Sequence, residues 1–229
     1  MIFLAMILGL LPGLIWIFFY LQEDPHPEPK RMILVAFIVG AMMAVPVIIL
    51  QLLTQDALNF FSIKNIIVSI VALALIEEFF KFIAAFWVTY KNPEFDEPID
   101  AMVYIITAAL GFATVENVLI MGNIFSSANT AFLTASLTTA FSTIALRFIG
   151  ATLLHTLASG LMGYYWAKGI IRKSRLYLGY GFFLAGLIHS TFNFLIVKYQ
   201  SVNFIIPSLF LILGAIFVIV DFEKLRKMV

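Results

Sequence analysis

The sequence predicts an all-α, polytopic membrane helical bundle, and three observations lead to this prediction. Of the 229 residues, 62% are apolar and only 12% are charged, whereas soluble domains carry about 25% charged residues. About seven apolar stretches are each roughly 20 residues long, which is enough to cross the ~30 Å hydrocarbon core of a bilayer. These stretches lack the alternation of apolar and polar residues that is typical of outer-membrane barrels. We therefore expect a single transmembrane domain over residues 1–229, in a multi-pass protein of the cell membrane.

The composition also excludes several kinds of partner and site. A net charge of +1 provides no basic field for nucleic acid, so no nucleic-acid partner is expected. The lipid bilayer is the expected surrounding because of the apolar stretches. The chain has no cysteine, which excludes disulfides, thiolate metal sites and a cysteine nucleophile.

The first apolar run, Ile2 to Leu21, lacks the charged start and cleavage pattern of a signal peptide, so we expect a retained helix. A loop with three prolines follows. Pro46 is expected to kink the second helix, and a polar loop around Gln55 and Asp56 is expected to end it. Asp100 is well placed to cap the fourth helix. The seven predicted helices cover residues 2–21, 32–53, 63–90, 100–122, 131–166, 176–197 and 203–220.

The distribution of Lys and Arg between the loops predicts the orientation, because cytoplasmic loops carry the excess. With the N-terminus outside, the outward loops contain only Lys64 and Lys198. The inward loops and tail contain Lys30, Arg31, Lys91, Lys168, Arg172, Lys173, Arg175, Lys224, Arg226 and Lys227. The sequence thus predicts an N-terminus outside and a cytoplasmic C-terminus.

A set of polar and ionisable residues interrupts the apolar stretches of helices three to six. Burying a charge at bilayer depth costs at least ~2.5 kcal/mol, so such residues are by default functional or paired. The set consists of Glu77, Glu78, Lys81, Glu116, Asn117, Arg147, His155, His189 and Asn193. At a rise of ~1.5 Å per residue, Glu77, His155 and His189 all fall near the membrane midplane. We expect four helices to line one water-containing cavity.

Helical spacing groups these residues further. Lys81 follows Glu77 by four residues and Glu78 by three, so it can lie beside either carboxylate. Adjacent positions differ by about 100° around a helix, so we expect one glutamate to face the site while the other pairs with Lys81 or Arg147. His189 and Asn193 are four residues apart, which places them on one helix face.

Two chemistries are compatible with these residue types. Two histidines and a carboxylate can hold zinc and leave a position for water, while another carboxylate acts as general base. Without metal, a glutamate can activate water directly, with His189 and Asn193 binding the oxyanion. The sequence contains no His-Glu-x-x-His motif, so a metal site must draw its ligands from different helices.

Four motifs resemble those of the PrsW family of intramembrane proteases, which is related to the CAAX-protease and bacteriocin-processing group. They are Glu77-Glu78-Phe79-Phe80-Lys81, Phe112-Ala113-Thr114-Val115-Glu116-Asn117, Arg147 with His155, and His189-Ser190-Thr191-Phe192-Asn193. The match runs from helix three to helix six, which suggests a catalytic core at about residues 63–198. The resemblance implies a metal-dependent membrane endopeptidase, and the best-known bacterial members clip membrane-anchored anti-sigma factors.

Carried over residue by residue, the resemblance places Glu77 and Glu78 on the paired-glutamate motif, and His155, His189 and Asn193 on the later catalytic positions. We expect Glu77 or Glu78 to be the general base. The histidines are expected either to bind metal or to polarise the scissile carbonyl. The expected zinc ligands are His155, His189 and Glu116, and the expected supporting residues are Lys81, Glu116, Asn117 and Arg147. The expected substrate is a membrane protein with a transmembrane helix.

Two other functions are compatible with the residue types. An ion or proton transporter also uses Glu, His, Lys and Arg inside a bundle, although the inverted repeats common in transporters are not apparent in the sequence. A non-catalytic descendant acting as a scaffold is disfavoured, because every expected site position carries a reactive residue type.

Overall fold

The protein is an all-helical bundle in its computed structural model, which describes residues 2–126, 133–199 and 205–228. The helices are α1 (Ile2–Tyr20), α2 (Lys30–Phe60), α3 (Ile66–Thr89), α4 (Asp100–Ser126), α5 (Leu133–Arg147), α6 (Leu153–Ile171), α7 (Leu176–Tyr199) and α8 (Ile205–Arg226). A π-helical turn, η2 (Phe148–Thr152), joins α5 to α6. The described residues therefore form seven rods when α5, η2 and α6 are counted as one. The predicted starts of two helices, at residues 131 and 203, lie outside the described residues.

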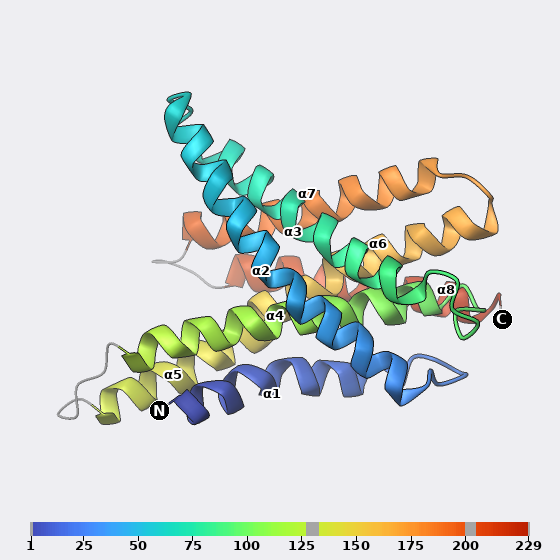
Figure 1. Cartoon of the computed structure of the whole chain (residues 1–229), viewed down its shortest axis with the longest axis horizontal. Coiled ribbons are helices and arrows are strands. Elements are labelled where there is room, and N and C mark those ends of the chain that lie inside the picture. Colours follow the sequence, from blue (N-terminus) through green and yellow to red (C-terminus); the bar gives the residue numbers. More distant parts are fainter. Residues whose placement is uncertain (1, 127–132, 200–204, 229) are drawn as a thin grey trace.

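Six of these rods are apolar and long enough to span a bilayer, which confirms a multi-pass membrane protein. α3 has 24 residues but is interrupted by Glu77, Glu78 and Lys81, the charged residues that the sequence analysis selected. α1 begins at one end of the bundle and α8 ends at the other (Figure 1). Which end faces the cytoplasm stays a prediction.

The second helix is longer than the sequence predicted. α2 has 31 residues and includes Gln55 and Asp56, so the prediction of a loop around these two residues is wrong. The polar side chains do not end the helix, and the hydroxyl of Thr54 donates to the carbonyl of Leu50 within it (2.7 Å). At 1.5 Å per residue, α2 measures about 46 Å and exceeds the hydrocarbon core. Its last turns extend beyond the neighbouring helices in Figure 1.

The centre of the bundle is α4, which packs against α1, α2 and α6. Residues 100–114 of α4 are all buried. The crossing of α2 over α4 is so close that two glycines are required. A Cβ atom on Gly40 would lie 2.0 Å from the carbonyl oxygen of Ala108, and one on Gly111 would lie 2.0 Å from that of Phe37. Small residues allow such backbone contact between membrane helices, and here they bring Gln51 of α2 near the charged residues of α3 and α4.

Asp100 begins α4, but it does not cap the helix in the expected way. Its Oδ2 accepts hydrogen bonds from the backbone N–H groups of Asp96 (3.0 Å) and Glu97 (2.8 Å). Both donors lie in the loop before the helix rather than in its first turn. The carboxylate therefore fixes the α3–α4 loop against the start of α4.

Candidate active site

α3 contributes two buried glutamates and one buried lysine to the interior of the bundle. The Nζ of Lys81 lies 2.7 Å from Oε1 of Glu78 and 3.7 Å from Oε2 of Glu77. Glu78 also accepts a hydrogen bond from the hydroxyl of Ser159 (3.4 Å). Lys81 thus pairs with both glutamates, more closely with Glu78, and the expected division into one paired and one site-facing glutamate is not seen.

His189 on α7 lies against both glutamates. Its Nδ1 is 2.6 Å from Oε1 of Glu78, and its Nε2 is 3.6 Å from Oε2 of Glu77. An ionised carboxylate only accepts hydrogen bonds, so Nδ1 of His189 carries the proton and donates a hydrogen bond to Glu78. Nε2 therefore presents its lone pair towards Glu77.

His155 on α6 lies between a cation and a carboxylate. Its Nδ1 is 2.6 Å from Nζ of Lys81, and its Nε2 is 3.0 Å from Oε2 of Glu116. Because Lys81 can only donate, Nδ1 accepts and Nε2 donates to Glu116. The ring of His155 lies 5.2 Å from that of His189, at an interplanar angle of 80°.

Glu116, Asn117 and Arg147 form a second layer beside the histidines. Nη2 of Arg147 lies 3.1 Å from Oε2 of Glu116, and its Nε donates to Oδ1 of Asn117. The amide of Asn117 in turn donates to the hydroxyl of Thr152 in the π-helical turn (3.2 Å). Arg147 thus pairs with Glu116 and not with the α3 glutamates.

A cavity of about 240 Å³ borders this layer between α2 and α4. Its lining includes Gln51, Glu116 and Arg147 together with Ile48 and Leu119. The side chains of Ile48 and Leu119 are also exposed on the outside of the bundle, so the cavity opens at the lipid-facing surface.

Gln51 was missed by the sequence analysis. Its Nε2 donates to Oε1 of Glu77 (2.8 Å). An uncharged glutamine close to the expected end of helix two gives no sequence signal, because the contact depends on how α2 crosses the bundle.

Asn193 does not accompany His189 in the expected way. Among the described residues, no hydrogen bond joins the two side chains. Asn193 instead lines a separate cavity, together with Thr143, Arg147 and Phe192. Asn193 and Arg147 thus border the same cavity, which His189 does not line.

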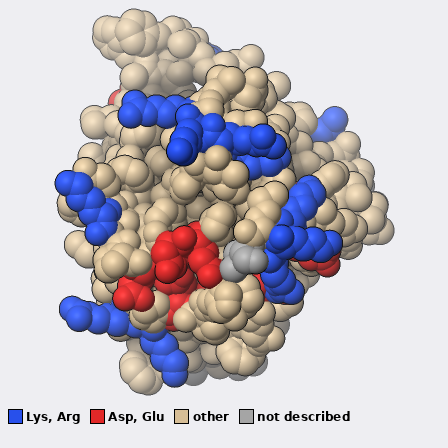
Figure 2. Space-filling view, turned by 90° about the vertical axis from the view of Figure 1, so that its right-hand side faces the viewer, with Lys and Arg blue, Asp and Glu red and all other residues tan. Residues whose placement is uncertain are grey.

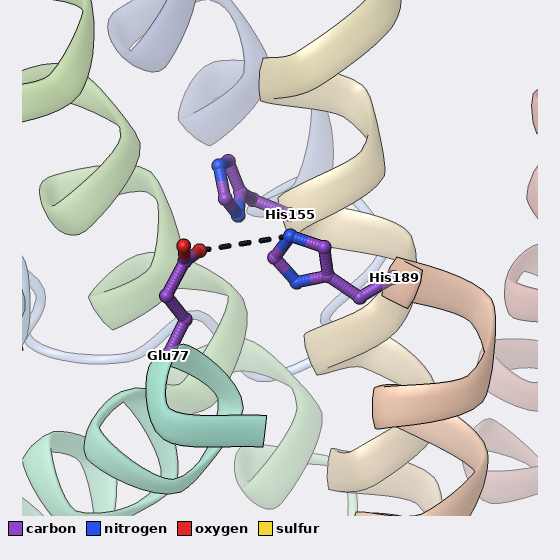
Figure 3. Close-up of side chains that lie close together, drawn as sticks. All are labelled: Glu77, His155 and His189. Carbon is purple, nitrogen blue, oxygen red and sulfur yellow. Dashed lines mark ion pairs between the residues drawn. The ribbon is translucent and has the colours of Figure 1, made fainter. Parts of the chain in front are cut away.

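Three of these residues form a group with the spacing of a metal site. One ligand atom each from Glu77, His155 and His189 lies within 4.8 Å of the others, and all three side chains are buried. Figure 3 shows them converging from α3, α6 and α7, with the contact between Glu77 and His189 marked. The carboxylate of this group belongs to Glu77, whereas the expected zinc ligand Glu116 contacts His155 and Arg147.

The donor set fits a zinc ion in kind, since neutral imidazole nitrogens and a carboxylate are its usual ligands. Oε2 of Glu77 is buried without a hydrogen-bond partner among the described residues, which is an unusual state for a buried carboxylate oxygen. His189 already offers a lone pair at Nε2. His155 must release one of its two present contacts before it can bind an ion.

Comparison with known proteins decides the family. Residues 28–220 match the model of the PrsW family, which is described as the PrsW family intramembrane metalloprotease. This range includes every residue of the site described above.

The chain belongs to the PrsW family. It is 30% identical to Protease PrsW of Oceanobacillus iheyensis, over 91% of this chain and 90% of that protein. It is also 29% identical to Protease PrsW of Clostridioides difficile, over 96% of this chain and 90% of the relative. No solved structure matches. Membership of the PrsW family makes the chain a membrane-embedded protease, as the sequence motifs implied.

Proposed function

We propose that this PrsW family member is a metal-dependent endopeptidase that cleaves membrane-anchored proteins within the bilayer. The observation that carries the proposal is the convergence of Glu77, His155 and His189 inside the bundle, with one carboxylate oxygen of Glu77 left without a hydrogen-bond partner among the described residues. Two histidines and a carboxylate from three different helices have the composition of a catalytic zinc site.

Glu77, His155 and His189 would hold the zinc ion. When bound, the ion would supply Lewis-acid polarisation of the scissile carbonyl and a water molecule of lowered pKa. Glu78 holds Nδ1 of His189 by a hydrogen bond of 2.6 Å, which fixes the ring and directs Nε2 towards Glu77. A carboxylate behind a ligating histidine is a recurrent way to orient that ligand. Lys81 compensates one of the two negative charges of the adjacent glutamates.

Glu116 is the carboxylate that we assign as the general base. Both of its contacts, with Arg147 and with His155, are made by Oε2. Within the described part of the chain, Oε1 has no hydrogen-bond partner, and the residue lines the cavity beside the site. Oε1 is therefore available to take a proton from water and to return it to the leaving amine. The sequence analysis expected Glu116 to be a zinc ligand and Glu77 or Glu78 to be the general base. In this proposal Glu77 is the zinc ligand and Glu116 is the general base.

The cavity between α2 and α4 supports entry of the substrate from the lipid. Its exposed apolar rim at Ile48 and Leu119 suits a transmembrane helix, whereas Gln51, Glu116 and Arg147 offer polar contacts deeper inside. A helical peptide bond is shielded by its own hydrogen bonds, so the substrate must unwind locally before it is cleaved. Among membrane-anchored proteins, anti-sigma factors are the substrate class that the sequence resemblance implies.

The test combines cleavage of a transmembrane reporter with elemental analysis of the purified full-length protein in detergent. We expect wild type to cleave and to hold about one zinc ion per chain. Glu77→Gln and His189→Ala should lose both metal and cleavage. Glu116→Gln should keep the metal but lose cleavage by about 100-fold or more. Glu94→Gln, which changes an exposed loop carboxylate, is the matched control and should behave as wild type.

Each departure from this pattern has a definite meaning. Cleavage without bound metal would overturn the metal dependence and assign water activation to the free oxygen of Glu77. Full metal content in an inactive Glu77→Gln variant would reverse the roles of Glu77 and Glu116. Absence of cleavage by well-folded wild type would overturn the assignment of activity.

A further inference from the structure

A second group of carboxylates lies at one end of the bundle, away from the active site. Asp24 and Glu28 belong to the loop between α1 and α2, and Asp100 is the first residue of α4. One oxygen atom from each of the three side chains lies within 4.8 Å of the others. Figure 2, which views the bundle from this end, shows a patch of acidic side chains with Lys and Arg side chains around it.

The three carboxylates are largely buried, and their nearest basic group is the imidazole of His26, which pairs with the neighbouring Glu97 (2.8 Å). Asp24 is 5% exposed and Asp100 is 1% exposed. Asp24 accepts a hydrogen bond from the backbone of His26 (3.0 Å), and Glu28 accepts one from the hydroxyl of Tyr104. Within residues 2–126, 133–199 and 205–228, no Lys or Arg side chain forms an ion pair with any of the three.

Two buried carboxylate oxygens in this region have no hydrogen-bond partner among the described residues. They are Oδ2 of Asp24 and Oε2 of the neighbouring Glu97. The side chain of Asp24 is thus more than nine-tenths buried, has an unsatisfied oxygen, and belongs to a group of three converging acids. Buried polar atoms are nearly always satisfied in folded proteins, so the unsatisfied oxygen of Asp24 is free to bind a ligand from solution.

Electrostatics leads to the same expectation. Burial, together with the nearby charges of Asp100 and Asp24, raises the pKa of Glu28 to about 8. Burial also raises the pKa of Asp24. A raised pKa favours the protonated form of Glu28, and a bound cation would compensate the group in place of that proton.

We propose that Asp24, Glu28 and Asp100 bind a hard divalent cation, Ca²⁺ or Mg²⁺. Carboxylate oxygens are the ligands that both ions prefer, and the group contains no imidazole or thiolate that would favour zinc. Ligand oxygens up to 4.8 Å apart fit calcium–oxygen bonds of about 2.3–2.6 Å, whereas magnesium–oxygen bonds of about 2.0–2.1 Å require them to move closer together. The ion would tie the α1–α2 loop to the start of α4, the central helix.

The first experiment measures ion binding by the full-length protein in detergent after treatment with a chelator. We expect Ca²⁺ or Mg²⁺ at millimolar concentration to raise the Tm of wild type by about 5 °C. Isothermal titration calorimetry should give one ion per chain at this site. Whether Ca²⁺ or Mg²⁺ gives the larger shift identifies the ion.

Matched variants separate the site from other effects of the ion. Asp24→Asn and Glu28→Gln should each abolish the increase in Tm. Glu94→Gln removes the same charge from an exposed position in the α3–α4 loop and should retain the increase. His189→Ala should also retain it, because the zinc site lies elsewhere.

The Tm measured in the absence of divalent ions separates ion binding from a purely structural role of Asp24. Removing one of three repelling carboxylates should leave the ion-free Tm of Asp24→Asn unchanged or higher than that of wild type, whereas a purely structural role would lower it. The proposal is overturned if neither ion binds wild type or shifts its Tm. It is also overturned if Asp24→Asn responds to the ions as wild type does.

Discussion

The two clusters of buried carboxylates differ in where their positive charge comes from. In the active site, Lys81 and Arg147 form ion pairs with Glu77, Glu78 and Glu116. At the end of the bundle, Asp24, Glu28 and Asp100 converge without a Lys or Arg ion pair in the described residues. Both groups contain three acids, but only the first contains its own Lys or Arg partners.

This difference reflects the surroundings of each cluster. Inside the membrane, an uncompensated charge has no water to stabilise it, so cations must be built into the fold. A loop at the end of the bundle is close to water, and dissolved ions can reach it. Internal compensation makes the active site stable before any ligand arrives, whereas external compensation allows the loop cluster to respond to its ionic surroundings.

The largest expected effect comes from removing the internal cation of the active site. Lys81→Met would leave Glu78 and Glu77 buried without their ammonium partner. Removal of one member of a buried ion pair costs about 3–5 kcal/mol, so we expect a large fall in the free energy of unfolding. Thermal unfolding followed by tryptophan fluorescence would measure it.

A double variant checks the reason for that loss. Glu78→Gln combined with Lys81→Met removes both charges, so it should recover part of the stability lost in Lys81→Met alone. If Lys81→Met were as stable as wild type, the two clusters would not differ in the way described.

An intermediate effect is expected at Arg147, which lies at the edge of the active-site cluster and is partly exposed to the cavity. Arg147→Gln should leave the fold intact but release Oε2 of Glu116. We expect kcat/KM to fall about tenfold, as is typical when a residue that orients another site residue is lost. Arg172→Gln, an exposed arginine in the α6–α7 loop, serves as the control. An unchanged kcat/KM in Arg147→Gln would assign Arg147 to packing alone.

The smallest effect is expected for Asp24→Asn in the absence of divalent ions. Because Asp24 forms no ion pair with a Lys or Arg among the described residues, the variant breaks none. It should change the free energy of unfolding by no more than about 0.5 kcal/mol, or should stabilise the protein. Denaturant unfolding in the presence of a chelator measures this change. Destabilisation comparable with that of Lys81→Met would show that Asp24 has an unrecognised internal partner.

The sequence alone predicts the fold well, because hydropathy over 20-residue windows reports directly on membrane-spanning helices. It also identifies Glu77, Glu78, Lys81, His155 and His189, since charged and histidine residues inside apolar stretches are rare. All five side chains meet inside the bundle.

What the sequence does not predict are contacts between polar residues outside such stretches, or contacts set by helix crossing. Gln51 reaches Glu77 because glycines bring α2 against α4, and no local pattern encodes that approach. Glu28 and Asp100 are separated by more than 70 residues and each is ordinary in its own loop. The grouping of Glu77, rather than Glu116, with both histidines depends on side-chain positions that spacing along a helix does not determine.

The π-helical turn at Phe148–Thr152 behaves as a one-residue insertion in an otherwise continuous helix. Arg147 and His155 are eight positions apart, so a regular α-helix would turn one about 80° away from the other. One extra residue accommodated in the turn reduces this offset to about 20°, and both side chains then reach the same oxygen of Glu116.

The wider turn also alters backbone pairing, and the indole of Trp16 donates to the carbonyl of Phe148 (3.0 Å). α1 contributes no side chain to the zinc-type group, yet it supports this turn. The gain or loss of a single codon in this segment would therefore rotate Arg147 relative to His155. Such a change would form or break the shared contact with Glu116 without replacing any residue of the candidate active site.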